Sequence, residues 1–144
     1  MPQTVDEGAH SRAPREAVWA LVADPLGWTD WGPWSRAEVL REGVPPPGGL
    51  HAVKRLKTYT ATVVEEVTLF DPPARLHYEM RSGLPLRGYR AEISLDEADG
   101  GGTDIRWATQ FEPKLPGAGA LYRSILSRFT AGAVERLARA AERG

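Results

Sequence analysis

The spacing of hydrophobic and polar positions divides this chain into two regions. Between residues 36 and 111, apolar and polar positions largely alternate, which is the period of strands that bury one face. In residues 117–143, apolar or small residues recur mostly three or four apart, which is the period of a helix. The pattern therefore predicts a run of strands followed by one long amphipathic helix.

The face of this helix that we expect to be buried is uneven. It consists of apolar and small residues, namely Ala118, Leu121, Tyr122, Ile125, Phe129, Gly132, Ala133, Leu137 and Ala140. Large side chains dominate its first half, whereas Gly132 and Ala133 leave space opposite them. We predict a cavity between this helix and the strands, opening near the tryptophan-bearing segment 26–34 and the loop 82–86.

The N-terminal part predicts one strand and two short helices. Residues 4–11 alternate weakly, as in a strand. Pro14 begins a helix over 14–23, and Asp24–Pro25 ends it, because proline disfavours helical geometry in the residue before it. The next segment, 26–34, holds Trp28, Trp31 and Trp34, and such a cluster either fills a core or lines a pocket.

Six further strands are predicted where alternation is bounded by turn residues: 36–41, 50–59, 60–70, 74–81, 86–95 and 104–111. Proline or glycine marks the connections at 43–49, 71–73, 82–85 and 96–103, whereas the bend near 58–61 has neither. Strands that follow one another through short turns pair antiparallel. With helices grouped at the two ends of the chain, the predicted class is α+β, with helices packed on one face of the sheet.

Composition narrows the possible functions. The chain has 144 residues, the length of one domain (1–144), and a net charge of −1, so no strong field attracts nucleic acid. It has no cysteine, which excludes disulfides, thiolate catalysis and cysteine-bound metals. The N-terminal residues show no basic region followed by an apolar run, and no stretch approaches the ~20 apolar residues of a membrane span. We expect a soluble, cytoplasmic protein.

Several stretches together carry a family resemblance. They are residues 10–19, Asp24, Trp28 and Trp31, residues 66–67 before 71–76, and Gly102–Thr103 before the last strand. In these features the chain resembles the START-like SRPBCC superfamily, and within it the group named for polyketide cyclases, dehydrases and lipid transport. The resemblance implies a helix-grip fold, in which a curved antiparallel sheet of about seven strands surrounds the C-terminal helix and an apolar cavity. Members include lipid carriers and aromatic cyclases, so the fold does not decide the function.

Strand alternation then selects the side chains that face the cavity. On strand 60–70, Ala61, Val63, Glu65, Val67 and Leu69 share the inward parity. Extending this parity to the other strands and to the helix gives the candidate ligand-binding residues Trp31, Val63, Glu65, Val67, Tyr78, Met80, Tyr89, Ile93, Trp107, Thr109, Tyr122, Ile125, Phe129 and Ala133. At this point two interpretations stay open: the aromatic members contact a ring-bearing ligand, or they only fill the interior.

Glu65 is the polar residue of most interest, because it occupies an inward position between Val63 and Val67. An unpaired buried carboxylate costs several kcal/mol, so it either pairs with a cation, with Arg55 or Arg87 as candidates, or takes up a proton through a raised pKa. The first case is a structural ion pair. The second makes Glu65 a hydrogen-bonding group or a general acid inside an apolar pocket.

The sequence offers little other chemistry. His10, His51 and His77 lack the spacing of metal ligands, the helix serines lack an adjacent base, and the glycines at 100–102 are not followed by a phosphate-binding helix. We therefore expect no metal and no cofactor.

The predicted function is binding, for transport or sequestration, of a small hydrophobic molecule such as a lipid or a polyketide-like ring compound. The alternative is a cyclase or dehydratase that uses Glu65, Tyr78, Arg87 and Tyr89 in the same cavity. No nucleic acid or membrane surface is expected as a partner, and the protein is expected to be a monomer or a homodimer.

Overall fold

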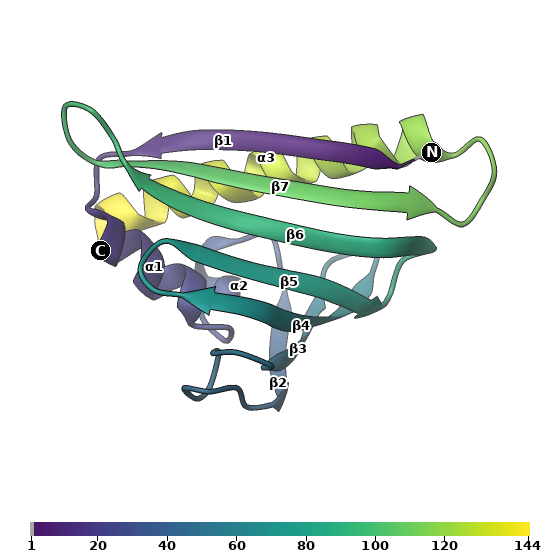
Figure 1. Cartoon of the computed structure of the whole chain (residues 1–144), viewed down its shortest axis with the longest axis horizontal. Coiled ribbons are helices and arrows are strands. Elements are labelled where there is room, and N and C mark those ends of the chain that lie inside the picture. The colour runs from purple at the N-terminus through teal and green to yellow at the C-terminus, as the bar shows by residue number, and fades with distance from the viewer. Residues whose placement is uncertain (1) are drawn as a thin grey trace.

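The alternating segments pair as one antiparallel sheet in the computed structural model, which describes residues 2–144. These residues form seven strands and three helices (Figure 1): β1 (Gln3–Ser11), α1 (Arg15–Ala23), α2 (Trp28–Trp31), β2 (Arg36–Arg41), β3 (Val53–Lys57), β4 (Thr62–Asp71), β5 (Arg75–Ser82), β6 (Leu86–Glu97), β7 (Thr103–Pro113) and α3 (Gly119–Arg143). The predicted fold class and element order are confirmed, with strand ends shifted by up to three residues.

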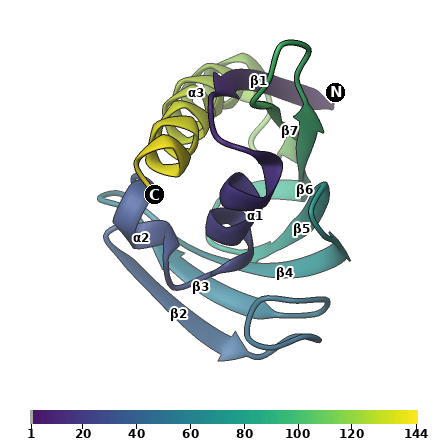
Figure 2. The same cartoon turned by 90° about the vertical axis from the view of Figure 1, so that its left-hand side faces the viewer.

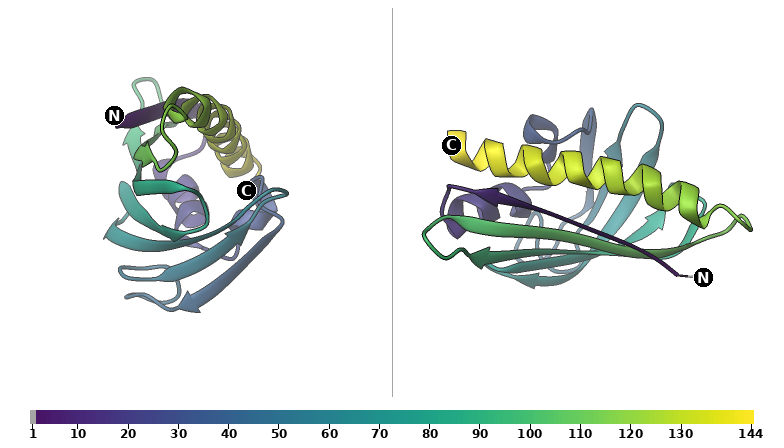
Figure 3. Two further views of the ribbon diagram at one scale, coloured as in Figure 1. Left: turned by 90° about the vertical axis from the view of Figure 1, so that its right-hand side faces the viewer. Right: turned by 90° about the horizontal axis from the view of Figure 1, so that it is seen from above.

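The strand order explains how the sheet encloses a core. It is β1-β7-β6-β5-β4-β3-β2, so only the pairing of β1 with β7 joins distant parts of the chain. The sheet curves, and its concave side holds all three helices (Figure 2). Helix α3 lies across the open side of the curve, next to β1 and β7, as both views in Figure 3 show. This is the helix-grip arrangement that the resemblance implies.

Helix α1 forms where the sequence places its beginning and end. Pro14 precedes the first helical residue with an extended backbone, and Asp24 ends the helix, also extended. Val18 and Val22 are its buried residues. None of the helices within residues 2–144 is both long and apolar enough to cross a membrane.

The buried face of α3 differs from the prediction. Leu121 and Ile125 are 62% and 52% exposed, and Gly132 faces open space. The buried residues are Leu126, Thr130, Ala133, Val134, Leu137, Ala138 and Ala141. The predicted and the observed buried faces share Ala133 and Leu137, which are buried as expected. The observed face extends to the adjacent row with Leu126 and Thr130, which the pattern did not select because Thr130 is polar. The space opposite the helix therefore arises at Ala133, and Gly132 has no part in it.

A bulge changes the predicted alternation at the end of β4. The pairing of β4 with β5 shifts between Val67 and Leu69, so Leu69 turns outward. Phe70 instead packs against the core, with its ring centre 5.2 Å from that of Trp19. The prediction that Leu69 faces inward was wrong, because an extra residue in one strand moves every later side chain to the other face.

Candidate ligand-binding cavity

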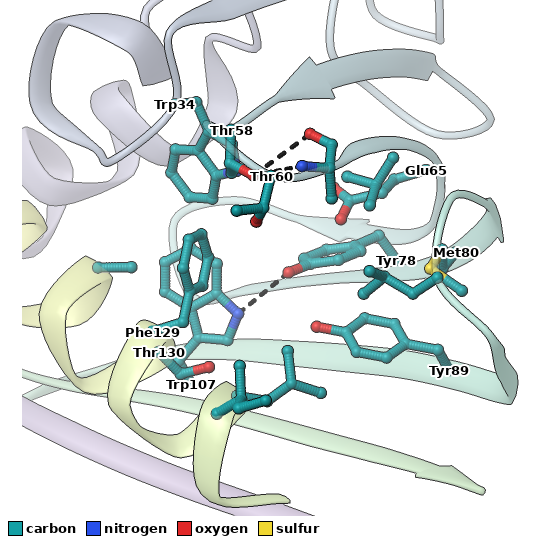
Figure 4. A pocket seen from close by; sticks show the side chains of 16 residues that line it. Trp34, Thr58, Thr60, Glu65, Tyr78, Met80, Tyr89, Trp107, Phe129 and Thr130 are labelled. Carbon is teal, nitrogen blue, oxygen red and sulfur yellow. Dashed lines mark hydrogen bonds between the residues drawn. The ribbon is translucent and has the colours of Figure 1, made fainter. Parts of the chain in front are cut away.

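A cavity of about 130 Å³ lies between α3 and the inner face of the sheet (Figure 4). Its wall is mainly aromatic and aliphatic, with a few polar groups. The residues of the wall are Trp34, Thr58, Thr60, Ala61, Val63, Glu65, Tyr78, Met80, Leu84, Tyr89, Trp107, Ile125, Leu126, Phe129, Thr130 and Ala133. They come from β4, β5, β6, β7 and α3, together with the loops after α2, β3 and β5.

The tryptophan cluster serves both of the roles that the sequence left open. Trp28, Trp31 and Trp34 are all buried, and their rings contact one another and Trp107. Trp34 also faces the cavity, where its ring stacks on Trp107 with centres 6.2 Å apart and meets Phe129 edge-on at 5.7 Å. The cluster is therefore a core whose outer ring forms a rigid end of the cavity.

The cavity is most open at Thr60 and Ile125, the wall residues that are exposed to solvent. Thr60 belongs to the β3–β4 hairpin, which closes without glycine or proline because Thr58 supplies the bonds. The Thr58 hydroxyl donates a hydrogen bond to the Ala61 carbonyl at 3.2 Å and accepts one from the Ala61 amide at 3.1 Å. Leu84 of the predicted 82–86 loop is half-buried on the wall, whereas Trp34 is buried. The hairpin, and not the tryptophan segment, forms the opening.

The structure brings most of the predicted ligand-binding residues together. Those on the wall are Val63, Glu65, Tyr78, Met80, Tyr89, Trp107, Ile125, Phe129 and Ala133. Trp31, Val67, Ile93, Thr109 and Tyr122 pack elsewhere in the interior and do not reach the wall. Arg87, a candidate for catalysis, is exposed and lines a surface groove with Gly88 and Glu112, because it points away from the side that buries Leu86.

Strand alternation correctly predicted that Glu65 faces inward, but it did not identify the cation that pairs with Glu65. Glu65 is 6% exposed, and Lys54, directly opposite it on β3, is 3% exposed. Lys54 Nζ lies 4.0 Å from Glu65 Oε1 and 3.2 Å from the centre of the Trp28 ring. The predicted partner Arg55 is one position away, so it points to the outer face and binds Glu38 at 3.1 Å. Lys54 shares its parity with the buried Ala52 and Leu56, and this signal could have identified it.

The ion pair leaves the Glu65 carboxylate incompletely satisfied. Within residues 2–144, Glu65 Oε1 has no hydrogen-bond partner, although it is buried. Burial raises the pKa of Glu65 to about 7, against the opposing effect of the Lys54 charge. Burial likewise lowers the pKa of Lys54 to about 8, against the charge of Glu65. Burial therefore disfavours the charged form of both residues.

Two tyrosines stand beside Glu65 on the wall. Tyr78 and Tyr89 extend in the same direction across the sheet (Figure 4). The Trp107 indole donates a hydrogen bond to the Tyr78 hydroxyl at 3.1 Å, which leaves the Tyr78 proton directed toward the neighbouring Tyr89 hydroxyl. Burial, and next the Glu65 charge, raise the pKa of both phenols, which keeps them protonated.

The histidines lie away from this site. His10 contacts Asp104 and His51 contacts Glu66, both in exposed pairs on the outer surface. Within residues 2–144, no three or more His, Cys, Asp or Glu residues lie close enough together to hold a metal ion.

Other members of the wall were missed in the sequence. Leu126 and Thr130 belong to the helix row that was not chosen, and Thr58 and Thr60 lie at the predicted bend. Ala61 was placed on the inward parity of its strand but was not chosen as a ligand-binding residue. Leu84 and Trp34 lie in loops, where no periodicity indicates the direction of a side chain.

The fold and the cavity define a helix-grip protein. Within that class, the chain belongs to the family described as polyketide cyclase / dehydrase and lipid transport, whose sequence model matches residues 2–142. Among curated protein sequences, none matches this chain.

Solved structures with the same fold are similar over almost the whole chain. The Zhui aromatase/cyclase of a Streptomyces species has a TM-score of 0.86 at 20% identity, covering 99% of this chain and 95% of its own. A Thermobifida fusca protein has a TM-score of 0.80 at 24% identity, covering 97% and 93%. A START superfamily protein of Mycobacterium smegmatis has a TM-score of 0.78 at 17% identity, covering 96% and 94%. At these identities the similarity shows a shared fold.

Proposed function

We propose that this protein binds a small, ring-bearing hydrophobic molecule in the cavity between α3 and the sheet. The observation that supports this most is the wall itself, in which Trp34, Trp107 and Phe129 present aromatic surfaces to a cavity of about 130 Å³. Native cores are packed with few voids larger than a water molecule, so a cavity of this size suggests a ligand.

The volume favours a ring over a long lipid chain. A protein cavity of about 150 Å³ is large enough to hold benzene. Drug-sized ligands occupy pockets of roughly 300–1,000 Å³, so a long acyl chain exceeds the present space. The ligand, or the part of it that enters the cavity, is therefore one small ring system, with any remainder extending past Thr60 and Ile125.

The apolar contribution alone gives weak binding. A side chain with one aromatic ring buries at least about 150 Å², which at about 25 cal/mol per Å² is worth roughly 4 kcal/mol. This corresponds to a Kd of about 1 mM for an unsubstituted single ring. Tight binding needs a larger ligand or additional polar contacts.

A second candidate function is a cyclase or dehydratase reaction, and the Glu65 site favours it. Burial raises the pKa of Glu65 to about 7, toward the range in which a general base or acid works best at neutral pH. Glu65 would remove a proton next to a substrate carbonyl, while Tyr78 and Tyr89 would donate hydrogen bonds to the carbonyl oxygen. The aromatase/cyclase among the similar structures and the family description are consistent with either function.

Ligand binding is tested by native mass spectrometry of the purified protein, followed by a fluorescence titration with any co-purified compound. The tryptophans on the wall, Trp34 and Trp107, report directly on the cavity. Ala133→Leu fills the cavity and is expected to weaken binding at least tenfold. The matched control is Gly132→Leu, which adds the same side chain on the exposed side of α3 and is expected to leave binding unchanged. Equal binding by both variants would contradict the proposed location.

A further inference from the structure

We infer that the cavity selects neutral ring compounds that carry a hydroxyl group, which donates a hydrogen bond to Glu65. This inference rests on the proposed function, since it requires a ligand in the cavity. It adds the chemical class of the ligand. It also assigns Lys54 as the residue that makes the cavity prefer a neutral ligand, because Lys54 balances the charge of Glu65.

The first argument is the incomplete satisfaction of Glu65. Its Oε1 atom is buried and has no hydrogen-bond partner within residues 2–144, and the residue lies on the cavity wall. A buried polar group without a partner costs about 1–3 kcal/mol, and more when it is charged. A hydroxyl group of a ligand removes this cost, because a neutral O–H donor to a carboxylate forms a short, charge-assisted bond.

The second argument concerns charge. Lys54 lies behind Glu65 and is not part of the wall, because its Nζ sits on the face of the Trp28 ring. It balances the Glu65 charge without entering the space for the ligand. An anionic ligand would bring a second negative charge against Glu65 in a poorly solvated site. A cationic ligand would compete with Lys54 for the same carboxylate. Only a neutral donor adds a hydrogen bond without adding charge.

The third argument is the orientation of the neighbouring donors. The Tyr78 hydroxyl accepts from Trp107 and interacts with the Tyr89 hydroxyl on the same wall, so the two phenols together keep one proton to donate to a ligand. Because the phenols act as donors, they leave the proton of a ligand hydroxyl for Glu65. They also suit a ring that carries an additional oxygen acceptor. Glu65 is thus the charged acceptor on the wall, where the other polar groups are the hydroxyl groups of threonine and tyrosine and the indole N–H groups of Trp34 and Trp107.

The test compares phenol with toluene, two rings of nearly equal size that differ by one hydroxyl group. Their Kd values are measured by ligand-observed NMR at pH 8, where phenol is neutral and Glu65 is mainly ionised. The variant Lys54→Met/Glu65→Met removes both charges and keeps the side-chain volume. We expect the preference for phenol over toluene to fall at least tenfold in this variant. Because the ratio of the two Kd values is compared between the variant and the wild-type protein, the difference in hydrophobicity between the two rings cancels.

A matched control removes an ion pair of the same kind from the outer face of the sheet. Arg55→Met/Glu38→Met makes the same change in charge near the same strands, outside the cavity wall. It is expected to keep the wild-type preference for phenol. Benzoate and benzylamine, the anionic and cationic analogues, are expected to bind wild type at least tenfold more weakly than phenol.

A pH series on the wild-type protein provides a measurement that needs no variant. The ionisable groups around Glu65 are Lys54 on β3, Tyr78 on β5 and Tyr89 on β6, and the wall residues of α3 have none. The tyrosines stay protonated, so below pH 7 Glu65 is the group that changes. The preference for phenol is expected to fall severalfold between pH 8 and pH 5.

The outcomes separate the two proposals. If neither phenol nor toluene binds the wild-type protein, the proposed function fails together with this inference. If both bind but the preference is unchanged by the variant or by pH, the inference is overturned while the cavity remains a binding site. Stronger binding of benzoate or benzylamine than of phenol also overturns it.

Discussion

Replacing both Lys54 and Glu65 with methionine removes a buried ion pair while keeping the interior filled. Both side chains are almost completely buried, and their charged atoms are 4.0 Å apart, beyond hydrogen-bonding distance. We expect the double variant to be more stable than the wild-type protein by about 1–4 kcal/mol at pH 7.5, the gain that replacement of buried ion pairs often gives. Methionine at position 54 replaces the cation–π contact of Lys54 with Trp28 by a favourable contact between sulfur and the aromatic ring.

The magnitude follows from the geometry. At 4.0 Å and an effective dielectric constant of about 20, the attraction between the two charges is about 4 kcal/mol. The desolvation penalty is several kcal/mol for each ion. The pKa of Glu65 rises from 4.5 to about 7 even with Lys54 present, so the charged carboxylate is disfavoured by about 3 kcal/mol. The pKa of Lys54 falls from 10.5 to about 8, which is a similar amount. The attraction therefore does not compensate for the two desolvation penalties.

The pH dependence has a definite sign. Because the folded-state pKa of Glu65 is raised, its contribution to stability is fully present below pH 4.5 and is lost as the pH rises to about 7. Because the folded-state pKa of Lys54 is lowered, the contribution of Lys54 to stability is present above pH 10.5 and is lost as the pH falls to about 8. The advantage of the double variant is thus largest between about pH 7 and 8 and smaller at pH 4.5.

The assay is urea denaturation at pH 4.5 and 7.5, with Lys54→Met and Glu65→Met measured separately. Each single variant is expected to lose about 3–5 kcal/mol, because it leaves one buried charge without a partner. A double variant less stable than wild type at pH 7.5 would refute the reasoning. So would single variants that are as stable as the double variant.

Three further predictions concern the core and the wall. Trp31→Ala is expected to lower the free energy of unfolding by about 3–5 kcal/mol, since Trp31 is buried among other tryptophans, and an unchanged urea midpoint would contradict this. Tyr78→Phe removes the acceptor of the Trp107 indole and is expected to cost about 1–3 kcal/mol, whereas a neutral effect would mean that this hydrogen bond contributes nothing. Leu69→Thr is expected to change the unfolding free energy by less than about 0.5 kcal/mol because Leu69 faces outward, and a large loss would place it inside.

Much of the fold was predictable because local patterns determine it. Strand alternation, the turns rich in proline and glycine, and the ends of α1 follow from the behaviour of individual residues. Glu65 was correctly placed inside by its parity alone. These features depend on interactions between residues close in sequence or between neighbouring strands.

The remaining features depend on distant contacts. The helix could bury either of two adjacent rows, and packing against β1 and β7, not periodicity, selects the row with Leu126 and Thr130. The bulge that turns Leu69 outward arises from the pairing of β4 with β5. The partner of Glu65 is set by register, since Lys54 and Arg55 are consecutive and only the pairing of β3 with β4 puts Lys54 opposite it.

The central claim, that a ring compound occupies the cavity, is tested most directly by the methyl group of Met80. This residue lies on the wall and is one of only two methionines in the chain, so a spectrum of protein labelled at the methionine methyl groups is simple to assign with Met80→Leu. On titration with phenol, we expect the Met80 signal to shift and saturate at a Kd of about 1 mM or lower. The same titration of Ala133→Leu is expected to shift it at least tenfold less at equal phenol concentration. A Met80 signal that does not move in the wild-type protein, or that moves equally in Ala133→Leu, would contradict the account.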